Sequence, residues 1–292
     1  MSISESFQLL VSRIAPLQSE LDKAKKHAAS IKARLQSSFN LNKFVVVGSH
    51  SRETAIRRYS DVDHFAVFSR HEFRTGDKYK RSDTVLNNIR DDLAQRFRQT
   101  SVQRDGPAVV VSFDQGDYSV DVVPAMFWEM NKDNWPIYYI PDGNGGWMRT
   151  SPELHNKYIR DADQRSGGKL KRTSQLIKYW RECRSPRIPI SSFHIDLLLA
   201  SQNVCEGVKS YAQRLTETFR LLTMRNCRAL QDPLGVANLV SAVKTEPQQE
   251  AACQAVAHAN DHAMKALDAE RSGNLREARR QWNIVFNDRF PN

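Results

Sequence analysis

The sequence predicts an α+β fold, with a mixed β-sheet in the first half of the chain and helices in the second half. Short apolar, β-branched runs bounded by turn residues recur between residues 41 and 127. From residue 152 onward, apolar side chains recur at three- and four-residue spacing, which is typical of helices. The 292 residues, of which 40% are hydrophobic, can bury a substantial core. We therefore expect a sheet-containing lobe over residues 1–150 and a helical lobe over residues 151–292.

The apolar pattern also predicts the individual elements. A long amphipathic helix is expected from about residue 4 to residue 38, kinked at Pro16 and able to brace both lobes. LNKFVVV and SDVDHFAVFS are expected to be strands, and residues 82–99 a helix. Residues 101–127 should form three strands with turns at 105–107 and 114–117, and residues 135–153 should be a loop. Six helices are then predicted, at about 152–164, 168–184, 192–206, 210–229, 251–272 and 274–287.

Composition indicates a cytoplasmic protein without membrane contact. No stretch approaches the roughly 18 apolar residues that cross a bilayer, and the first residues lack the basic-then-apolar pattern of a secretory signal. The cysteines form no CxxC pair, so we expect reduced thiols rather than a disulfide framework or a zinc site. They are Cys183, Cys205, Cys227 and Cys253.

Positive charge is concentrated in one segment of the chain. The formal net charge is +10, and between residues 165 and 187 eight basic residues accompany one acid, Glu182. Such a run is either a solvated helix face or a surface that meets a polyanion. The basic residues are Arg165, Lys169, Lys171, Arg172, Lys178, Arg181, Arg184 and Arg187.

Three aspartates form the candidate catalytic and metal-binding set. Side chains two apart in a strand share a face, so Asp61 and Asp63 of SDVD project together. A hard divalent cation would relieve their mutual repulsion. Asp121 lies in YSVDVV, a strand that otherwise reads as buried, where an unpaired carboxylate is costly. The alternative interpretation is purely structural, with a turn cap, an exposed acid and a buried salt bridge.

A Gly-Ser pair precedes the aspartates. Gly48 and Ser49 end the first predicted strand about a dozen residues before Asp61. Glycine has no Cβ, so a phosphate can approach the backbone there, and the serine hydroxyl and amides can donate to it. The pair is a weak signal alone, but the order strand, Gly-Ser, short helix, DxD and a later strand Asp is a specific one.

This order resembles the nucleotidyltransferase superfamily that includes DNA polymerase beta, poly(A) polymerase and CCA-adding enzymes. GSHSRETAIRRYSDVDHF matches its signature, and YSVDVVP supplies the third carboxylate. The resemblance implies a polymerase-beta-like sheet and two Mg²⁺ ions, with Mn²⁺ as an alternative, held by Asp61, Asp63 and Asp121. It also implies that Ser49 contacts the terminal phosphates. A ribose hydroxyl would then attack the α-phosphorus in line, and pyrophosphate would leave.

The second half is similar to the cyclic-oligonucleotide synthases, the CD-NTases. LIKYW, SSFH and the closing EARRQWNIVFNDRFPN carry this resemblance, which implies triphosphate contacts for Lys178 and Ser192 and base stacking for Phe193. The structural alternatives are an exposed lysine, a helix N-cap at Ser192 and a core phenylalanine. The resemblance implies a bacterial enzyme that makes a cyclic di- or trinucleotide second messenger from ATP and a second triphosphate, in antiphage (CBASS) signalling.

Several alternatives stay open at this level. They are synthesis of a linear oligonucleotide, nucleotide transfer to tRNA, protein or a small molecule, and a non-catalytic nucleic-acid-binding role. We expect an effector that senses the product, and a regulatory protein is a candidate partner. The animal DNA sensor of this family carries a zinc-binding insertion that has no counterpart here. The helical pair His258 and His262 lacks cysteines at zinc-ligand spacing, so activation by DNA is unsupported. His64 should be structural, and His50 has no assigned role.

Overall fold

The computed structural model describes residues 1–113 and 118–291, so the turn predicted at 114–117 lies outside the described residues. The chain divides into two compact units. We call Pro16–Glu53 with Arg57–Lys157 the sheet unit, and Met1–Ala15, Thr54–Ile56 and Tyr158–Asn292 the helical unit. The first fifteen residues thus belong with the C-terminal helices, whereas the sequence placed them in the sheet-containing lobe.

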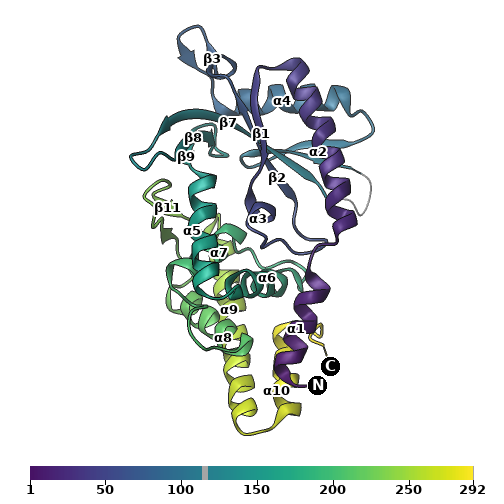
Figure 1. Cartoon of the computed structure of the whole chain (residues 1–292), viewed down its shortest axis with the longest axis vertical. Coiled ribbons are helices and arrows are strands. Elements are labelled where there is room, and N and C mark those ends of the chain that lie inside the picture. Colours follow the sequence, from purple (N-terminus) through teal and green to yellow (C-terminus); the bar gives the residue numbers. More distant parts are fainter. Residues whose placement is uncertain (114–117, 292) are drawn as a thin grey trace. The chain divides into compact units, whose positions relative to one another are not determined.

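The sheet unit contains the expected mixed sheet (Figure 1). Among the described residues its strands follow the order β1-β2-β7-β6-β5, with β8 paired to β7 and β9 paired to β8. β2 and β7 are parallel, and the other pairs are antiparallel. The strands are β1 (Leu41–Val46), β2 (Val62–Phe68), β5 (Ser101–Asp105), β6 (Ala108–Ser112), β7 (Val120–Met130), β8 (Pro136–Pro141) and β9 (Trp147–Thr150).

The prediction of a loop over residues 135–153 is wrong, because this segment supplies β8 and β9. The prolines suggested a break, but Pro136 and Pro141 are the first and last residues of β8, where proline is tolerated. Ile137 and Tyr138 between them are buried. Smaller elements of the sheet unit are α3 (Gly48–Ser51), a 3₁₀ turn (Arg70–Phe73) and the hairpin of β3 (Arg74–Thr75) and β4 (Lys78–Tyr79).

Two helices share one apolar cluster with the sheet. Ile31 and Leu35 of α2 (Gln18–Ser38) and four residues of α4 (Ser82–Arg96) pack with buried residues of β2, β6 and β7. Arg34 of α2 donates to both carboxylate oxygens of Asp92 in α4, at 3.0 and 2.6 Å. These contacts fix both helices on the sheet.

The expected long N-terminal helix is present as two helices, α1 (Ile3–Ile14) and α2, which are separated at Pro16. Proline has no N–H to donate and clashes with the preceding turn, so the helix ends before it. A capping box between Ser2 and Glu5 begins α1. Phe7 of α1 lies 5.0 Å from the Trp282 ring and 4.8 Å from the Phe290 ring, which places α1 in the helical unit.

The helical unit is built around one large apolar cluster. α9 and α10 form an antiparallel pair, drawn in yellow-green and yellow in Figure 1. A short hairpin of β10 (Leu230–Gln231) and β11 (Leu239–Val240) was not predicted. The helices are α5 (Pro152–Arg165), α6 (Lys169–Glu182), α7 (Ser192–Ser201), α8 (Tyr211–Met224), α9 (Glu246–Arg271) and α10 (Leu275–Val285). Within the described part of the chain, no helix has the length and apolar character that a bilayer crossing requires.

Replacing Phe7 with alanine should lower the free energy of unfolding by about 3 to 5 kcal/mol, because the ring is fully buried and its removal leaves a cavity beside the aromatic rings of Tyr211, Trp282, Phe286 and Phe290. Urea denaturation of the wild type and the variant measures the loss. Exposed Leu17 is a control position, since its alanine variant removes little buried area. Equal losses at the two positions would contradict the packing role of Phe7.

Candidate active site

The parallel pairing of β2 and β7 brings two of the predicted aspartates together. Asp63 is the second residue of β2 and Asp121 is the second residue of β7, and the two are direct partners in the register. Asp61 is exposed and lies one residue before β2. Partner residues of adjacent strands point to the same face of a sheet, so Asp63 and Asp121 share one face and Asp61 lies beside them along the chain.

Gly48 is in close contact with the Asp63 side chain. A Cβ atom at position 48 would lie 1.8 Å from Asp63 Oδ2, a distance that no side chain permits. The φ angle of Gly48 is +64°, in the left-handed region that glycine adopts most easily. The glycine therefore serves the backbone turn and leaves room for the carboxylate, which explains the Gly-Ser pair found in the sequence.

Ser49 lies in a turn held by side-chain hydrogen bonds. The residue is buried, and the backbone N–H of Val47 just before the turn donates to the Asp63 carbonyl at 2.8 Å. Ser51 Oγ donates to the Gly48 carbonyl at 2.9 Å, and Asn156 Nδ2 donates to Ser51 Oγ at 3.0 Å. These bonds fix the backbone of the Gly48–Ser51 turn next to the aspartates.

Asp121 has the electrostatics of a metal ligand without its metal. Burial, followed by the negative charges of Asp61, Asp63 and Asp105, raises the pKa of the Asp121 carboxyl to about 8. Its Oδ1 atom is buried and has no hydrogen-bond partner among the described residues. A buried carboxylate oxygen without a partner is costly, and a divalent cation would remove that cost.

The donor set fits a hard cation. All three predicted ligands are carboxylates, which Mg²⁺ and Mn²⁺ prefer, and Gly48 leaves the approach to Asp63 clear. Among residues 1–113 and 118–291, no three His, Cys, Asp or Glu side chains are already closed into a metal cluster. Asp61, Asp63 and Asp121 are thus the residues that could hold the ions.

The predicted triphosphate and base contacts lie in the helical unit. Lys178 is almost fully buried, with 1% of its surface exposed, and its Nζ donates to Thr54 Oγ1 at 2.7 Å and forms an ion pair with Asp196. Ser192 Oγ accepts a hydrogen bond from Arg181 at 2.9 Å. The N-cap of α7 is the preceding residue, Ser191, and not Ser192.

Two carboxylates escaped the sequence reasoning. Asp105 ends β5 and adds to the field at Asp121, but in the sequence it reads only as part of a turn. Asp196 is fully buried in α7, whose sequence SFHIDLLLAS is apolar around the acid. A charged residue in such a helix needs a partner, and this was a signal available in the sequence.

The remaining predicted residues have structural surroundings. Phe193 is half-buried and packs against the apolar cluster of the helical unit. The His64 ring stacks on Phe44 with centroids 4.7 Å apart, and burial lowers its pKa. His50 Nε2 lies 3.4 Å from the Ser60 carbonyl oxygen. The centroids of the His258 and His262 rings are 4.5 Å apart, and His262 Nδ1 forms a hydrogen bond with Gln281 Oε1.

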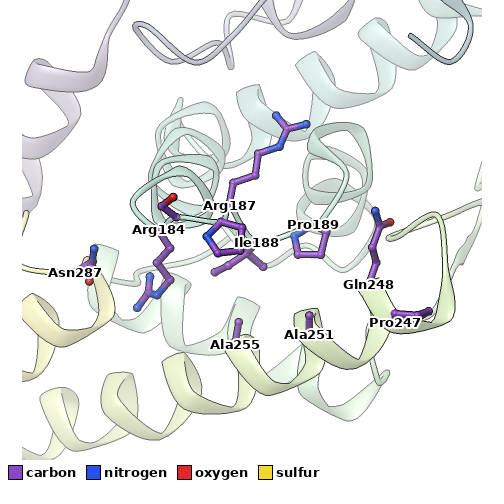
Figure 2. Close-up of a pocket in the computed structure, with 11 residues that line it drawn as sticks. Arg184, Arg187, Ile188, Pro189, Pro247, Gln248, Ala251, Ala255 and Asn287 are labelled. Atoms are coloured by element: carbon purple, nitrogen blue, oxygen red, sulfur yellow. The ribbon is translucent and has the colours of Figure 1, made fainter.

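A separate hollow of about 750 Å³ lies within the helical unit (Figure 2). The loop of residues 184–189 forms one side, and Ala251 and Ala255 of α9 form the other. Arg187 extends away from α9. None of the predicted site residues lines this hollow.

Comparison with known proteins gives one family. The model of the Second Messenger Oligonucleotide or Dinucleotide Synthetase (SMODS) domain matches residues 1–163. A probable cyclic nucleotide synthase of Bacillus cereus (strain VD146) is 26% identical over 84% of this chain and 81% of that protein. The cyclic AMP-AMP-AMP synthase of Escherichia coli (strain MS 115-1) is 24% identical over 79% of this chain and 77% of that protein.

Solved structures agree on the fold. E. coli MS115-1 CdnC with ATP superposes with a TM-score of 0.76 at 21% identity, over 100% of this chain and 99% of that chain. The same protein in its complex with HORMA-deltaN gives a TM-score of 0.72 at 22% identity, over 96% and 95% of the two chains. The likeness covers both units.

In the absence of metal, the contribution of Asp121 to the stability of the protein should fall as the pH rises from about 4 to about 8. Between its unfolded pKa of about 3.9 and its folded value of about 8, Asp121 binds more protons in the native state than in the unfolded state. Denaturation in chelator across this range measures the effect. Asp121→Asn should gain stability over the wild type as the pH rises, and parallel profiles for the two proteins would contradict the assignment.

Proposed function

Because the chain belongs to the family of second messenger oligonucleotide or dinucleotide synthetases, we propose that it joins nucleoside triphosphates into a cyclic di- or trinucleotide at the aspartates of the sheet unit. The observation that carries this proposal is the pairing of Asp63 with Asp121 across β2 and β7. It places a buried Asp121 oxygen, which has no hydrogen-bond partner within residues 1–113 and 118–291, beside a second carboxylate, and such a pair suits a divalent cation.

Each aspartate has a distinct role in this proposal. Asp61 and Asp63 would hold the ion that accompanies the triphosphate, and all three aspartates would hold the catalytic ion. When bound, the two ions lower the pKa of that hydroxyl and neutralise charge on the phosphates. Asp121 is held within β7 by the register with β2, so its position helps to fix the geometry of in-line attack.

The Gly48–Ser51 turn is the proposed phosphate contact of the sheet unit. Gly48 turns the backbone so that the Ser49 hydroxyl can donate to a phosphate oxygen, while the space of the missing Gly48 side chain is taken by the Asp63 carboxylate. The bonds from Ser51 and Asn156 hold the turn in one conformation before substrate arrives. This preorganisation reduces the ordering cost of binding.

Lys178, Ser192 and Phe193 are the proposed substrate contacts of the helical unit, and Lys178 and Ser192 already have hydrogen-bond partners. The Lys178 ammonium donates to Thr54 and Asp196, so a triphosphate contact would require it to exchange one of these partners. Ser192 would likewise contact phosphate while accepting from Arg181. Phe193 retains partial exposure, which is compatible with stacking on a base.

ATP is the proposed first substrate, and a protein is the proposed regulator. CdnC of E. coli has been solved both with ATP and with HORMA-deltaN, and its fold matches this chain over nearly its full length. The curated relatives are named for cyclic nucleotide products, one of them with three adenylates. A cyclic product would diffuse to an effector, so the enzyme need not bind that effector.

The proposal predicts a phosphatase-resistant oligonucleotide when the protein is incubated with the four ribonucleoside triphosphates and Mg²⁺ or Mn²⁺. Asp61→Asn combined with Asp63→Asn should abolish this product, because the ions lose two ligands. The measurement is chromatography with mass spectrometry after phosphatase treatment.

The matched control is Asp77→Asn combined with Asp133→Asn, which removes the same charge from exposed positions of the sheet unit. A ladder of linear products would show that the enzyme makes linear and not cyclic oligonucleotides. Undiminished product from the Asp61 and Asp63 variant would contradict the metal assignment.

Gly48→Ala should lower turnover by roughly 100-fold, since the new Cβ displaces the Asp63 carboxylate or the turn by about an ångström. Gly76→Ala is the control, because Gly76 also has a positive φ, of 59°, but nothing lies within 4 Å of its Cβ position. Both variants carry the same backbone strain, so only the contact differs. Steady-state rates of pyrophosphate release compare them, and equal losses would show that backbone strain alone acts.

A further inference from the structure

A closed polar network lies inside the helical unit, around Asp196. The Asp196 carboxylate pairs with Lys178 at 2.8 Å and accepts from Thr54 Oγ1 at 3.0 Å and from the Ser174 hydroxyl. Lys178 also donates to the Thr54 hydroxyl oxygen at 2.7 Å and to the Thr54 carbonyl oxygen at 3.3 Å. All four side chains are at most 1% exposed.

Because its charges are buried, this network requires close geometry and a full set of hydrogen bonds. Two opposite charges removed from water are stable only with close geometry and with hydrogen bonds to the remaining donors and acceptors. Here the Lys178 ammonium has Asp196 and both oxygens of Thr54 as partners, and both Asp196 oxygens accept. Loss of Asp196 would leave the ammonium buried without its counter-ion. The network therefore has one favourable arrangement, and that arrangement includes Thr54.

Thr54 is far from its network partners in the sequence, but along the chain it lies close to residues of the candidate active site. It belongs to the three-residue segment Thr54–Ile56 of the helical unit, between Ser49 and Asp61 in the chain. Gln175 of α6 donates to the Ala55 carbonyl at 2.9 Å, and the Ile56 side chain is buried in the apolar cluster. Side chains of α6 and α7 thus anchor this segment at each of its residues.

The chain enters and leaves the anchored segment in a strained conformation. Glu53, just before it, has φ of 59°, and Arg58, two residues after it, has φ of 69°. For residues other than glycine this left-handed region is unfavourable, and it persists only where the surroundings impose it. The strain on both sides indicates that the anchor, and not local preference, decides the path from Ser49 to Asp61.

We infer that Asp196 is a positioning residue of the nucleotidyl-transfer reaction. Its carboxylate orients Lys178 and Thr54, and these hold the segment whose two ends continue to Ser49 and to Asp61. This inference rests on the proposed function for its kinetic consequence, but the anchoring itself does not. Asp196 does not touch substrate in this role, and it acts through the backbone between two groups that do.

The test uses Thr54→Val, which keeps the shape of the side chain and removes its hydroxyl. Hydrogen–deuterium exchange should become faster at the backbone amides of residues 52–61, since the anchor is weakened. Thr218→Val is the matched control: Thr218 is equally buried in the helical unit, but its hydroxyl bonds only the Arg214 carbonyl of its own helix. Thr54→Ser retains the hydroxyl and should restore the slow exchange.

Kinetics provide the second readout. Thr54→Val should lower kcat about 10-fold to 100-fold, because misplacement by about an ångström has effects of this size. Its thermal midpoint should fall no further than that of Thr218→Val. Asp196→Asn should show the same faster exchange at residues 52–61, and Thr54→Ser should regain most of the wild-type kcat.

The outcomes separate the two hypotheses. Exchange at residues 52–61 that is as slow in Thr54→Val as in Thr218→Val overturns the positioning role. Faster exchange with an unchanged kcat also overturns it. A wild-type protein that makes no product contradicts the proposed function, while the exchange result still decides whether Asp196 and Thr54 anchor the segment.

Discussion

The parallel pairing of β2 with β7 is the constraint on which the candidate site depends. It sets Asp63 opposite Asp121, and the rest of the sheet keeps both strands buried on their flanks. Burial of the Asp121 carboxyl, followed by the negative charges of Asp61, Asp63 and Asp105, raises its pKa to about 8, and these effects oppose folding with the carboxylate ionised. The fold tolerates this cost because the surrounding apolar packing of α2 and α4 over the sheet is extensive. The apolar packing of the sheet unit thus offsets the electrostatic cost of placing the carboxylates together.

The sequence selected three candidate site residues but did not outline the whole sheet around them. Period-two alternation and a buried strand acid were enough to select Asp61, Asp63 and Asp121, because strand geometry is regular. The mixed sheet and the six C-terminal helices followed from apolar spacing. β8 and β9 were missed because their flanking prolines and glycines resemble a loop, while the pairing of β8 with β7 and of β9 with β8 is not visible in the residue pattern. The close approach of Gly48 to Asp63 likewise required coordinates.

The basic segment shows why charge patterns alone do not assign a surface. Lys178 is paired with Asp196, and Arg181 donates to Glu182 and to the Ile190 carbonyl. Arg184 donates to the Ile284 carbonyl. Some of the positive charge that suggested a polyanion partner therefore stabilises the helical unit from within. Spacing along a helix does not reveal which cations are satisfied internally, because partners such as Asp196 and the Ile284 carbonyl come from distant parts of the chain.

The arrangement of α1 has a consequence for synthesis of the chain on the ribosome. Residues 3–14 are made first, yet Phe7 packs against Trp282 and Phe290, which are made last. The Thr54–Ile56 segment must also wait for α6 and α7 before it is anchored. The sheet unit, by contrast, has all its strands once residue 157 has emerged. Its aspartates can therefore be in register while the Thr54–Ile56 segment, which precedes Asp61 in the chain, still lacks its anchor, so synthesis of α6 and α7 is itself a step in assembling the proposed site.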